Sequence, residues 1–201
     1  RIGLRNGDSK WITGEAARAD VQRWRARSSA ILTGIGTVLA DDPEMKARVS
    51  GAVKQPLRVV ADSAWRIPRT ARLLEDAGSV LVAGGGDAPR DLLDAGAQCI
   101  SSETTENGID LEFLLDELGR RELNEVQVEA GSRLCGSLLA HGLVDEVLLY
   151  MAPVMLGDGG PGPFSFGPLD SMTDRAHFSL LETVRVGDDT RLRLKPRAGA
   201  D

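Results

Sequence analysis

The chain has 201 residues, of which 42% are hydrophobic and 27% charged, as in a globular domain with a sizeable core. Its formal net charge of −6 argues against a non-specific nucleic-acid binder, although a few local arginines would be enough to hold an anionic ligand. Two cysteines without a CxxC pattern and two histidines give no clustered zinc site, and no apolar run approaches the roughly 20 residues that span a bilayer, which favours a reduced cytoplasmic protein without a metal.

The first half of the chain alternates helical and strand patterns. With Thr13 as the expected N-cap, the pattern predicts a helix that runs to about Arg27 and is locally basic although the protein is acidic. Asp87 is expected to cap a short helix that runs through Leu93, and Asp110 to cap a helix with a leucine-rich core face. Strands are predicted at 30–33, 57–61, 79–83 and 98–101, and the apolar runs at 57–61 and 79–83 predict that those two strands are buried.

A glycine-rich turn follows the first predicted strand. Gly34 and Gly36 suggest a dinucleotide-binding turn, but the third glycine of that fingerprint falls on Leu39, so the fingerprint fails. A short helical piece remains. Asp41 and Asp42 stand near its end, and at least one of them is expected to serve the turn.

The stretch 123–142 is a strand, a glycine turn and a helix. A small-residue turn that leads into a helix presents unpaired backbone N–H groups and the positive end of the helix dipole, which suits a phosphate. Taken alone, the stretch is equally the ordinary βα unit of a core, and that simpler interpretation is favoured.

The C-terminal part has an antiparallel pattern. A long apolar strand is predicted over 145–152, a Gly/Pro-rich loop over 153–168, and a hairpin of two alternating strands over 178–186 and 190–195. The sequence therefore predicts one α/β domain over residues 1–201, with a mixed, mostly parallel sheet flanked by helices and a C-terminal antiparallel hairpin.

Five motifs, in this order and spacing, resemble one family over nearly the whole chain. They resemble the reductase domain of the bifunctional riboflavin biosynthesis deaminase/reductase, which has a dihydrofolate-reductase-like fold. Two parts of such proteins are missing here: the zinc signature of the deaminase, and the first reductase strand, which contributes contacts in the family. The motifs are DSKWITG at 8–14, AILTGIGTVLADDP at 30–43, PLRVVADS at 56–63, VEAG at 128–131 and GLVDE at 142–146.

The resemblance implies NADPH-dependent reduction of 5-amino-6-(5-phosphoribosylamino)uracil to 5-amino-6-(5-phosphoribitylamino)uracil. It also implies a homodimer or higher oligomer and, in a longer protein, a fused deaminase domain. Carried over position by position, it implies substrate contacts at Ser9, Arg25, Met45, Arg48 and Glu129. Cofactor contacts are implied at Trp11, Thr37, Asp41 and Ser63, and a pyrophosphate turn at Gly131, Ser132, Arg133, Leu134, Cys135, Gly136 and Ser137.

The chemistry of these residues agrees with their implied roles. Arg25 and Arg48 suit the substrate phosphate, and Glu129 suits the N–H groups of the pyrimidine. Asp41 is the nearest candidate for the proton donor that ring opening needs. Beyond the resemblance, we expect Ser63 and Arg66 to bind the 2′-phosphate of NADPH, since Arg66 is the only cation close to that turn in sequence.

Two other functions stay open at this stage. One is a dihydrofolate-reductase-like enzyme that reduces another pterin or pyrimidine, although an arginine clamp has no use for a substrate without a phosphate. The other is a truncated domain that binds nucleotide without turnover. Measuring NADPH oxidation with the phosphoribosylamino substrate separates all three.

Overall fold

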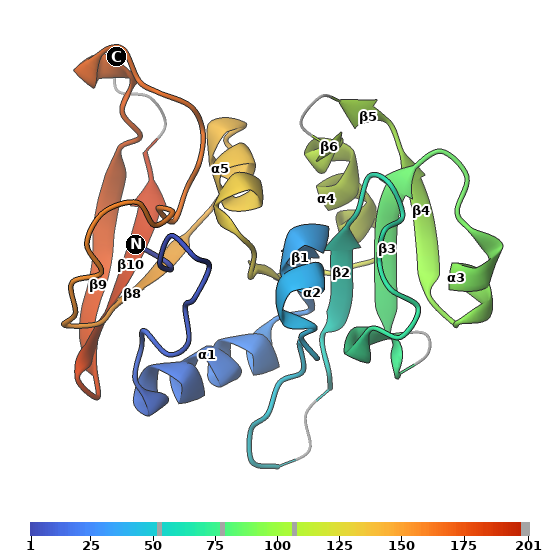
Figure 1. The fold of residues 1–201 in the computed structure, drawn as a ribbon, viewed down its shortest axis with the longest axis horizontal. Coiled ribbons are helices and arrows are strands. Elements are labelled where there is room, and N and C mark those ends of the chain that lie inside the picture. Colours follow the sequence, from blue (N-terminus) through green and yellow to red (C-terminus); the bar gives the residue numbers. More distant parts are fainter. Residues whose placement is uncertain (52–53, 77–78, 106–107, 198–201) are drawn as a thin grey trace. The chain divides into compact units, whose positions relative to one another are not determined.

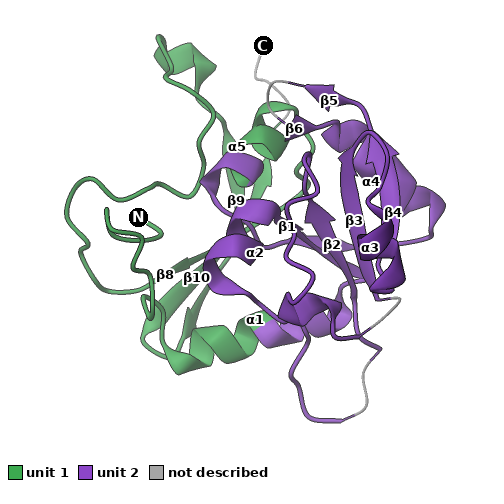
Figure 2. Ribbon diagram, turned by 45° about the vertical axis from the view of Figure 1, so that its right-hand side comes forward, with its two compact units in different colours: residues 1–21, 135–201 green, residues 22–134 purple. Residues whose placement is uncertain are grey.

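The computed structural model describes residues 1–51, 54–76, 79–105 and 108–197. The chain folds into two compact units (Figure 2). The small unit combines residues 1–21 with 135–201, and the large unit consists of residues 22–134. The chain passes from one unit to the other inside two helices, α1 (Glu15–Arg27) and α5 (Ser132–Ala140).

The large unit is built on a parallel sheet of five strands in the order β4-β3-β2-β1-β7 (Figure 1). Leu32 of β1, Val59 of β2 and Leu81 of β3 are each 0% exposed. Strands buried on both faces need apolar side chains at successive positions, which explains the continuous apolar runs in the sequence. The strands are β1 (Ala30–Gly34), β2 (Leu57–Ala61), β3 (Val80–Gly85), β4 (Gln98–Ser102) and β7 (Val126–Val128).

Helices cover this sheet. Val38, Leu73 and Leu92, from three helical segments, pack in one core cluster with Val60 and Val82 of the sheet. In Figure 1, α2 lies in front of the sheet and α4 behind it. The helical segments are α2 (Ile35–Asp41), the 3-10 turn η1 (Arg72–Leu74), α3 (Arg90–Asp94) and α4 (Leu111–Arg120).

The helix caps predicted at Asp110 and Asp87 have different outcomes. The Asp110 cap is confirmed, because its carboxylate accepts a hydrogen bond of 3.0 Å from the backbone N–H of Phe113. The Asp87 cap is wrong, because α3 begins at Arg90 and Pro89 occupies the cap position. The proline ring keeps the residue before it out of the helical conformation, so the helix cannot begin nearer to Asp87.

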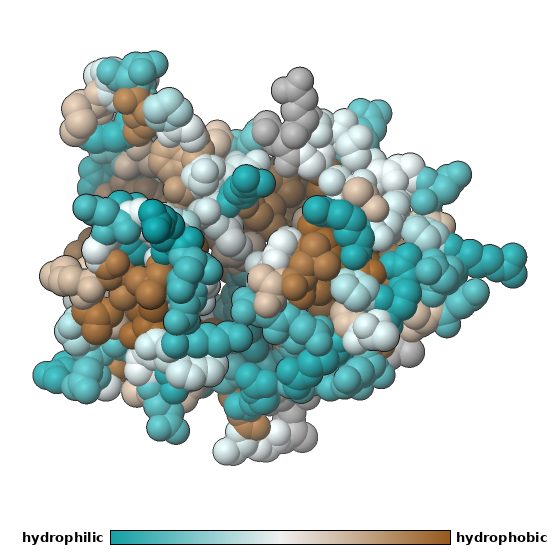
Figure 3. Space-filling model, in the orientation of Figure 1, coloured by the Kyte–Doolittle hydropathy of each residue, from teal (hydrophilic) through white to brown (hydrophobic). Residues whose placement is uncertain are grey.

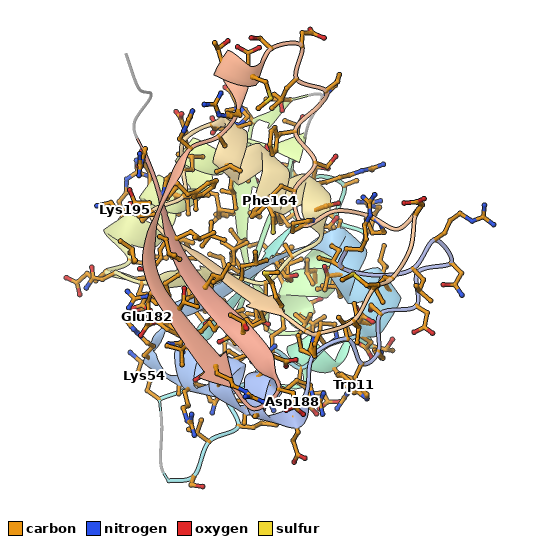
Figure 4. All side chains as sticks on the ribbon, turned by 90° about the vertical axis from the view of Figure 1, so that its left-hand side faces the viewer. Trp11, Lys54, Phe164, Glu182, Asp188 and Lys195 are labelled. Atoms are coloured by element: carbon orange, nitrogen blue, oxygen red, sulfur yellow. The ribbon has the colours of Figure 1, made fainter. Side chains whose placement is uncertain are left out.

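The small unit holds an antiparallel sheet in the order β8-β10-β9. Figure 4 shows its two long strands, with Glu182 on β9 and Lys195 on β10. The hairpin and the α/β class are confirmed, but in the described residues the parallel and antiparallel strands form separate sheets instead of one mixed sheet. The strands are β8 (Val147–Met151), β9 (Phe178–Val186) and β10 (Asp189–Pro196), and the 3-10 turn η2 (Met172–Asp174) precedes β9.

One short pairing in the large unit is not predicted from the sequence. Strands β5 (Thr104–Thr105) and β6 (Gly108–Ile109) pair antiparallel. Two residues are too few to show the alternation by which a strand is recognised.

A polar network joins α1 to all three strands of the small unit. The carboxylate of Asp20 accepts hydrogen bonds from the Tyr150 hydroxyl at 2.8 Å and from Arg191 at 2.6 Å. Arg191 also donates to Glu182 at 2.8 Å. Asp20 is 7% exposed, so this carboxylate is held by partners and not by water. Burial, together with Asp20, raises the pKa of Tyr150 above its ordinary value.

The Gly/Pro-rich loop packs closely on two other segments of the small unit. A Cβ at Gly136 in α5 would collide with the backbone of Ser165, and a Cβ at Gly160 would collide with the carbonyl of Gly3. The backbone N–H of Ile2 donates to the carbonyl of Pro161 at 3.0 Å. Phe164 marks this loop in Figure 4. Glycine is required at 136 and 160 because two backbones meet there.

Candidate functional site

The carboxyl ends of the parallel strands gather polar and glycine residues in the large unit. Asp62 and Ser63 follow β2, the glycines at 84–86 end β3, and Glu129 follows β7 directly. The carboxyl edge is where open parallel sheets bind ligands, because the strand ends and helix starts leave side chains and backbone groups without sheet partners. This edge is therefore the candidate site.

Arg25 and Glu129 meet at this edge in a bidentate ion pair. Arg25 Nε donates to Glu129 Oε1 at 2.7 Å, and Nη2 donates to Oε2 at 2.5 Å. Arg25 Nη1 also donates to the backbone carbonyl of Lys46 at 3.1 Å. The two side chains are only 13% and 23% exposed. The pair joins α1, the end of β7 and the segment that follows α2, and the two charges balance each other.

Two further expected substrate residues lie in the segment after α2. Met45 is 3% exposed and has a positive φ of 51°, so its side chain belongs to the core. Arg48 has a side chain 63% exposed that pairs with Glu44 at 3.0 Å. Arg25 and Arg48, both expected on one phosphate, therefore have different carboxylate partners in the described structure.

The two aspartates after α2 differ in role. Asp42 has the left-handed φ of 40°, its backbone N–H donates to the Val38 carbonyl, and its carboxylate accepts from the backbone N–H of Arg72 at 2.9 Å. The expected turn role is thus confirmed for Asp42. Asp41 is exposed at the end of the same helix, one turn from Thr37, which is partly buried.

The turn after β2 is organised by a buried carboxylate. Asp62 is 0% exposed, and its Oδ2 accepts from the backbone N–H of Ile67 at 2.8 Å. Its Oδ1 lies 3.6 Å from Nε of Arg66, whose side chain is 55% exposed. Ser63, partly buried, stands next to Asp62 in this turn, and its carbonyl accepts from the N–H of Gly85 at 3.1 Å.

Trp65 explains the glycines that end β3. Its indole N–H donates to the carbonyl of Gly85 at 2.6 Å, and its ring lies against Gly84, where an added Cβ would be 2.5 Å from the ring. Gly84 therefore has a packing role in this structure.

We expect Gly84→Ala to lower the free energy of unfolding by about 1–3 kcal/mol, because the new methyl group overpacks against Trp65. Urea denaturation measures the change. Gly119→Ala is the matched control: Gly119 lies in α4 with no atom within 4 Å of its Cβ position, so alanine there should raise stability by up to about 1 kcal/mol. Equal stability of the Gly84→Ala variant and the original chain contradicts the packing role.

The expected pyrophosphate turn spans the start of α5. Gly131 is exposed, nothing lies within 4 Å of its Cβ position, and α5 begins at the next residue, Ser132. Leu134 packs on Gly34 at the end of β1, which fixes the first turn of the helix on the sheet. Arg133 is exposed. Of the rest of the turn, Cys135, Gly136 and Ser137 belong to the small unit, where Gly136 is buried.

Two expected residues, Ser9 and Trp11, belong to the small unit. Ser9 is exposed, and the Trp11 ring, 72% exposed, carries the Arg18 guanidinium 4.6 Å from its centroid (Figure 4 labels Trp11). An exposed indole stacked with a cation offers a flat face to a ligand.

Sequence reasoning missed two side chains beside Glu129. Gln127 donates from Nε2 to Glu129 Oε1 at 2.7 Å, and Ser28 Oγ lies 3.4 Å from Gln127 Oε1. The available signal was the spacing, because residues two apart on a strand point to the same side.

In the part of the chain that the structure describes, no three His, Cys, Asp or Glu side chains are grouped to hold a metal ion. No described helix combines the length and apolar character that a membrane crossing requires.

Fold and site together define an α/β protein with its candidate site at the carboxyl edge of a parallel sheet. The family model described as the RibD C-terminal domain matches residues 1–192. The chain belongs to the RibD C-terminal domain family, and the resemblance seen in the five motifs is confirmed.

Two curated relatives match almost the whole chain. Riboflavin biosynthesis protein RibD of Haemophilus influenzae is 37% identical over 209 residues, which cover 98% of this chain and 55% of that protein. The 5-amino-6-(5-phosphoribosylamino)uracil reductase of Buchnera aphidicola is 34% identical over 208 residues, which cover 96% of this chain and 99% of that protein. This chain thus spans about half the length of the RibD relative.

Solved structures are similar as well. Acinetobacter baumannii RibD, form 2, has a TM-score of 0.89 and 36% sequence identity, and the match covers 98% of this chain and 54% of that one. A diaminohydroxyphosphoribosylaminopyrimidine deaminase/5-amino-6-(5-phosphoribosylamino)uracil reductase from Thermotoga maritima has a TM-score of 0.81 and 25% identity, covering 98% of this chain and 53% of that one. The fold is therefore that of RibD reductase domains.

Proposed function

We propose that this chain catalyses the NADPH-dependent reduction of 5-amino-6-(5-phosphoribosylamino)uracil to 5-amino-6-(5-phosphoribitylamino)uracil in riboflavin biosynthesis. One observation carries the proposal: the match to the reductase of Buchnera aphidicola covers 99% of that protein. Almost every residue of that named reductase therefore has a counterpart in this chain. In the reaction one hydride and one proton add to the substrate, and the opened ribose becomes a ribityl chain.

The turn before α5 suits a nicotinamide cofactor. Gly131 leaves open space, and the first turn of a helix presents backbone N–H groups that have no partner within the helix. These groups and the helix dipole favour a pyrophosphate, with Gly131 to Ser137 around it. When bound, the nicotinamide supplies the hydride. Thr37, Ser63 and Trp11 are proposed as further contacts to the cofactor.

Glu129 is proposed to recognise the pyrimidine ring. Its carboxylate is only an acceptor, and the ring N–H groups of the substrate are donors. Ser9 is proposed as a further substrate contact, and Met45, whose side chain lies in the core, is proposed to shape the segment that carries Arg48. Asp41 is the proposed proton donor, supported by its exposed carboxylate at the end of α2.

The test of the activity is NADPH oxidation, followed by its absorbance, with the phosphoribosylamino substrate. We expect substrate-dependent oxidation and formation of the ribityl product by mass spectrometry. Oxidation with dihydrofolate instead would assign another reductase of the same fold, and cofactor binding without turnover would assign a nucleotide-binding domain. Either result rejects the proposal.

Arg48→Ala should raise KM for the substrate about tenfold, the loss of one charge-assisted hydrogen bond to the phosphate of about 1.4 kcal/mol. kcat should change little, because the phosphate is remote from the reacting carbon. Steady-state kinetics measure both constants. Arg120→Ala is a matched control on α4, since its side chain is 62% exposed, close to the 63% of Arg48. An unchanged KM in Arg48→Ala rejects the phosphate role.

Ser63 and Arg66 are proposed to bind the 2′-phosphate of NADPH. The Arg66 side chain is 55% exposed and lies 3.6 Å from the Asp62 carboxylate, so it is held near the turn and open to an anion. Arg66→Ala should raise KM for NADPH about tenfold and leave KM for NADH unchanged. Arg69→Ala, whose guanidinium pairs with Asp91, serves as the control. An unchanged NADPH/NADH preference in Arg66→Ala rejects the 2′-phosphate role of Arg66.

We also propose that the protein is cytoplasmic, forms a homodimer or higher oligomer, and works in a longer protein with a fused deaminase domain. The deaminase is supported by the name of the Thermotoga maritima protein, of which this chain covers 53%. The oligomer is supported by exposed apolar side chains around the end of β8 and the loop after it, Met151, Val154 and Met155. Figure 3 shows apolar patches among hydrophilic surface on one face. Light scattering gives the mass in solution.

A further inference from the structure

The carboxylate of Glu129 has one acceptor position left among the described residues. A carboxylate offers about four lone-pair sites, two on each oxygen. Oε1 accepts from Arg25 Nε and from Gln127 Nε2, both at 2.7 Å, whereas Oε2 accepts only from Arg25 Nη2 at 2.5 Å. The open position is therefore on Oε2, and one donor of a ligand can bind there.

Glu129 is held at two places, its backbone and its carboxylate. Its backbone N–H donates to the carbonyl of Leu32 at 2.9 Å, which attaches the end of β7 to β1. Arg25 holds the carboxylate from α1. The bidentate pair fixes the plane of the carboxylate and fills one lone-pair site on each oxygen. A third donor, on one oxygen, leaves a single site for a ligand and decides on which oxygen it lies.

Gln127 supplies that third donor. It lies two residues before Glu129, on the same side of the strand. Its amide orientation follows from chemistry, because the reverse orientation would bring the amide oxygen within 2.7 Å of a carboxylate oxygen, acceptor against acceptor.

The amide oxygen of Gln127 lies beside the end of α1. Ser28 is 6% exposed, and its one hydroxyl hydrogen has two acceptors within reach, the Trp24 carbonyl at 2.9 Å and Gln127 Oε1 at 3.4 Å. The amide thus lies between a buried hydroxyl and the carboxylate. Neither Gln127 nor Ser28 is among the expected site residues.

We propose that Gln127 is a positioning residue for the reaction, which fixes Glu129 so that Oε2 presents its single open acceptor to a pyrimidine N–H of the substrate. The inference rests on the proposed function and deepens it. Gln127 does not touch the substrate. It acts through Glu129, so its loss should affect how the pyrimidine is held and leave the cofactor site as it was.

Gln127→Leu is the first test, because leucine keeps the size of the side chain and removes the amide. We expect kcat/KM for the uracil substrate to fall about 10- to 100-fold, as for the loss of a hydrogen bond to a charged group. KM for NADPH should change less than about twofold. Gln98→Leu on β4 is the matched control, since Gln98 accepts from Arg121 and β4 lies at the opposite edge of the parallel sheet from β7, and its kinetics should equal those of the original chain.

Gln127→Glu adds a readout that a structural role would not move. A protonated carboxyl at 127 can donate to Glu129, whereas an ionised one repels it. Among the described residues, Arg25 from α1 is the charged group that contacts Glu129, and the Lys46 ammonium lies on Asp76 at 2.7 Å instead. Activity of Gln127→Glu relative to the original chain should therefore rise as the pH falls from about 8 to about 5.5.

The outcomes separate the inference from the proposed function. An active original chain with unchanged kcat/KM in Gln127→Leu, or a Gln127→Glu profile parallel to the original, overturns the inference alone. An inactive original chain rejects the proposed function. In that case a double-mutant cycle decides: non-additive effects of Gln127→Leu and Glu129→Gln on the urea midpoint sustain the contact, and additive effects overturn it.

Discussion

Replacing Glu129 with glutamine should lower kcat/KM for the uracil substrate at least about 100-fold, while KM for NADPH stays within about twofold. The substitution keeps the shape and removes the charge. The Arg25 guanidinium, 13% exposed, then loses its anion, and the new amide must turn an NH2 group toward one of two donors, Arg25 or Gln127. An acceptor with two lone-pair sites replaces one with four, so the open position for the substrate is lost.

Glu125→Gln is the control for that experiment. Glu125 lies four residues earlier and pairs with Arg27 at 3.0 Å, but its side chain is 41% exposed, and we expect unchanged kinetics. A collapse of NADPH binding in Glu129→Gln, instead of a loss of turnover, would mean that Glu129 organises the cofactor turn. Near-normal kcat/KM would remove Glu129 from the site.

Replacing Asp20 with alanine should lower the free energy of unfolding by about 3–5 kcal/mol. The carboxylate is 7% exposed and is the partner of both the Arg191 guanidinium and the Tyr150 hydroxyl. Removing the Asp20 carboxylate takes from the buried Arg191 guanidinium one of its two carboxylate partners, leaving Glu182, and takes from the Tyr150 hydroxyl its acceptor. Urea unfolding followed by circular dichroism measures the loss.

The Arg185–Asp188 pair is the control, since its side chains are 79% and 89% exposed (Figure 4 labels Asp188). Asp188→Ala should change stability by less than about 0.5 kcal/mol. If both variants lose the same small amount, the Asp20 network does not stabilise the small unit.

A second readout of this network comes from the only tyrosine in the chain, Tyr150. Burial and Asp20 raise its pKa, so the neutral hydroxyl is favoured in the folded state. Its contribution to stability is complete below the ordinary tyrosine pKa of about 10 and is lost as the pH rises through the higher folded value. Phenolate absorbance should therefore titrate above pH 10 in the original chain, and closer to 10 in a folded Asp20→Asn variant.

Much of the fold is predictable from local patterns. The strand predicted at 57–61 and that at 178–186 are confirmed to the residue, because hydrophobic runs and alternation are local properties. The separation of the strands into two sheets was not predictable, since strand order depends on long-range pairing. The Asp87 cap failed because the proline two residues later decides where the helix can begin.

The candidate site was predictable in its residue types more than in its contacts. Glu129 and Arg25 were both expected, but their ion pair joins positions 104 residues apart in sequence. No local pattern shows that Arg25, expected on the substrate phosphate, forms an ion pair with Glu129, expected on the pyrimidine. Gln127 was missed for the same reason, because its proposed importance depends on its hydrogen bond to Glu129, which is visible only in the folded structure.

The interrupted course of the chain has a consequence for how the protein is made. The large unit is one continuous segment, complete at residue 134, whereas residues 1–21 find their partners only after the last strands exist. Gly14 donates to Asp189 over a separation of 175 residues, and Arg191 to Asp20 over 171. During synthesis we therefore expect residues 1–21 to emerge before the large unit and to dock after it has folded. Closure of that long loop should limit the folding rate of the small unit, while the parallel sheet forms earlier.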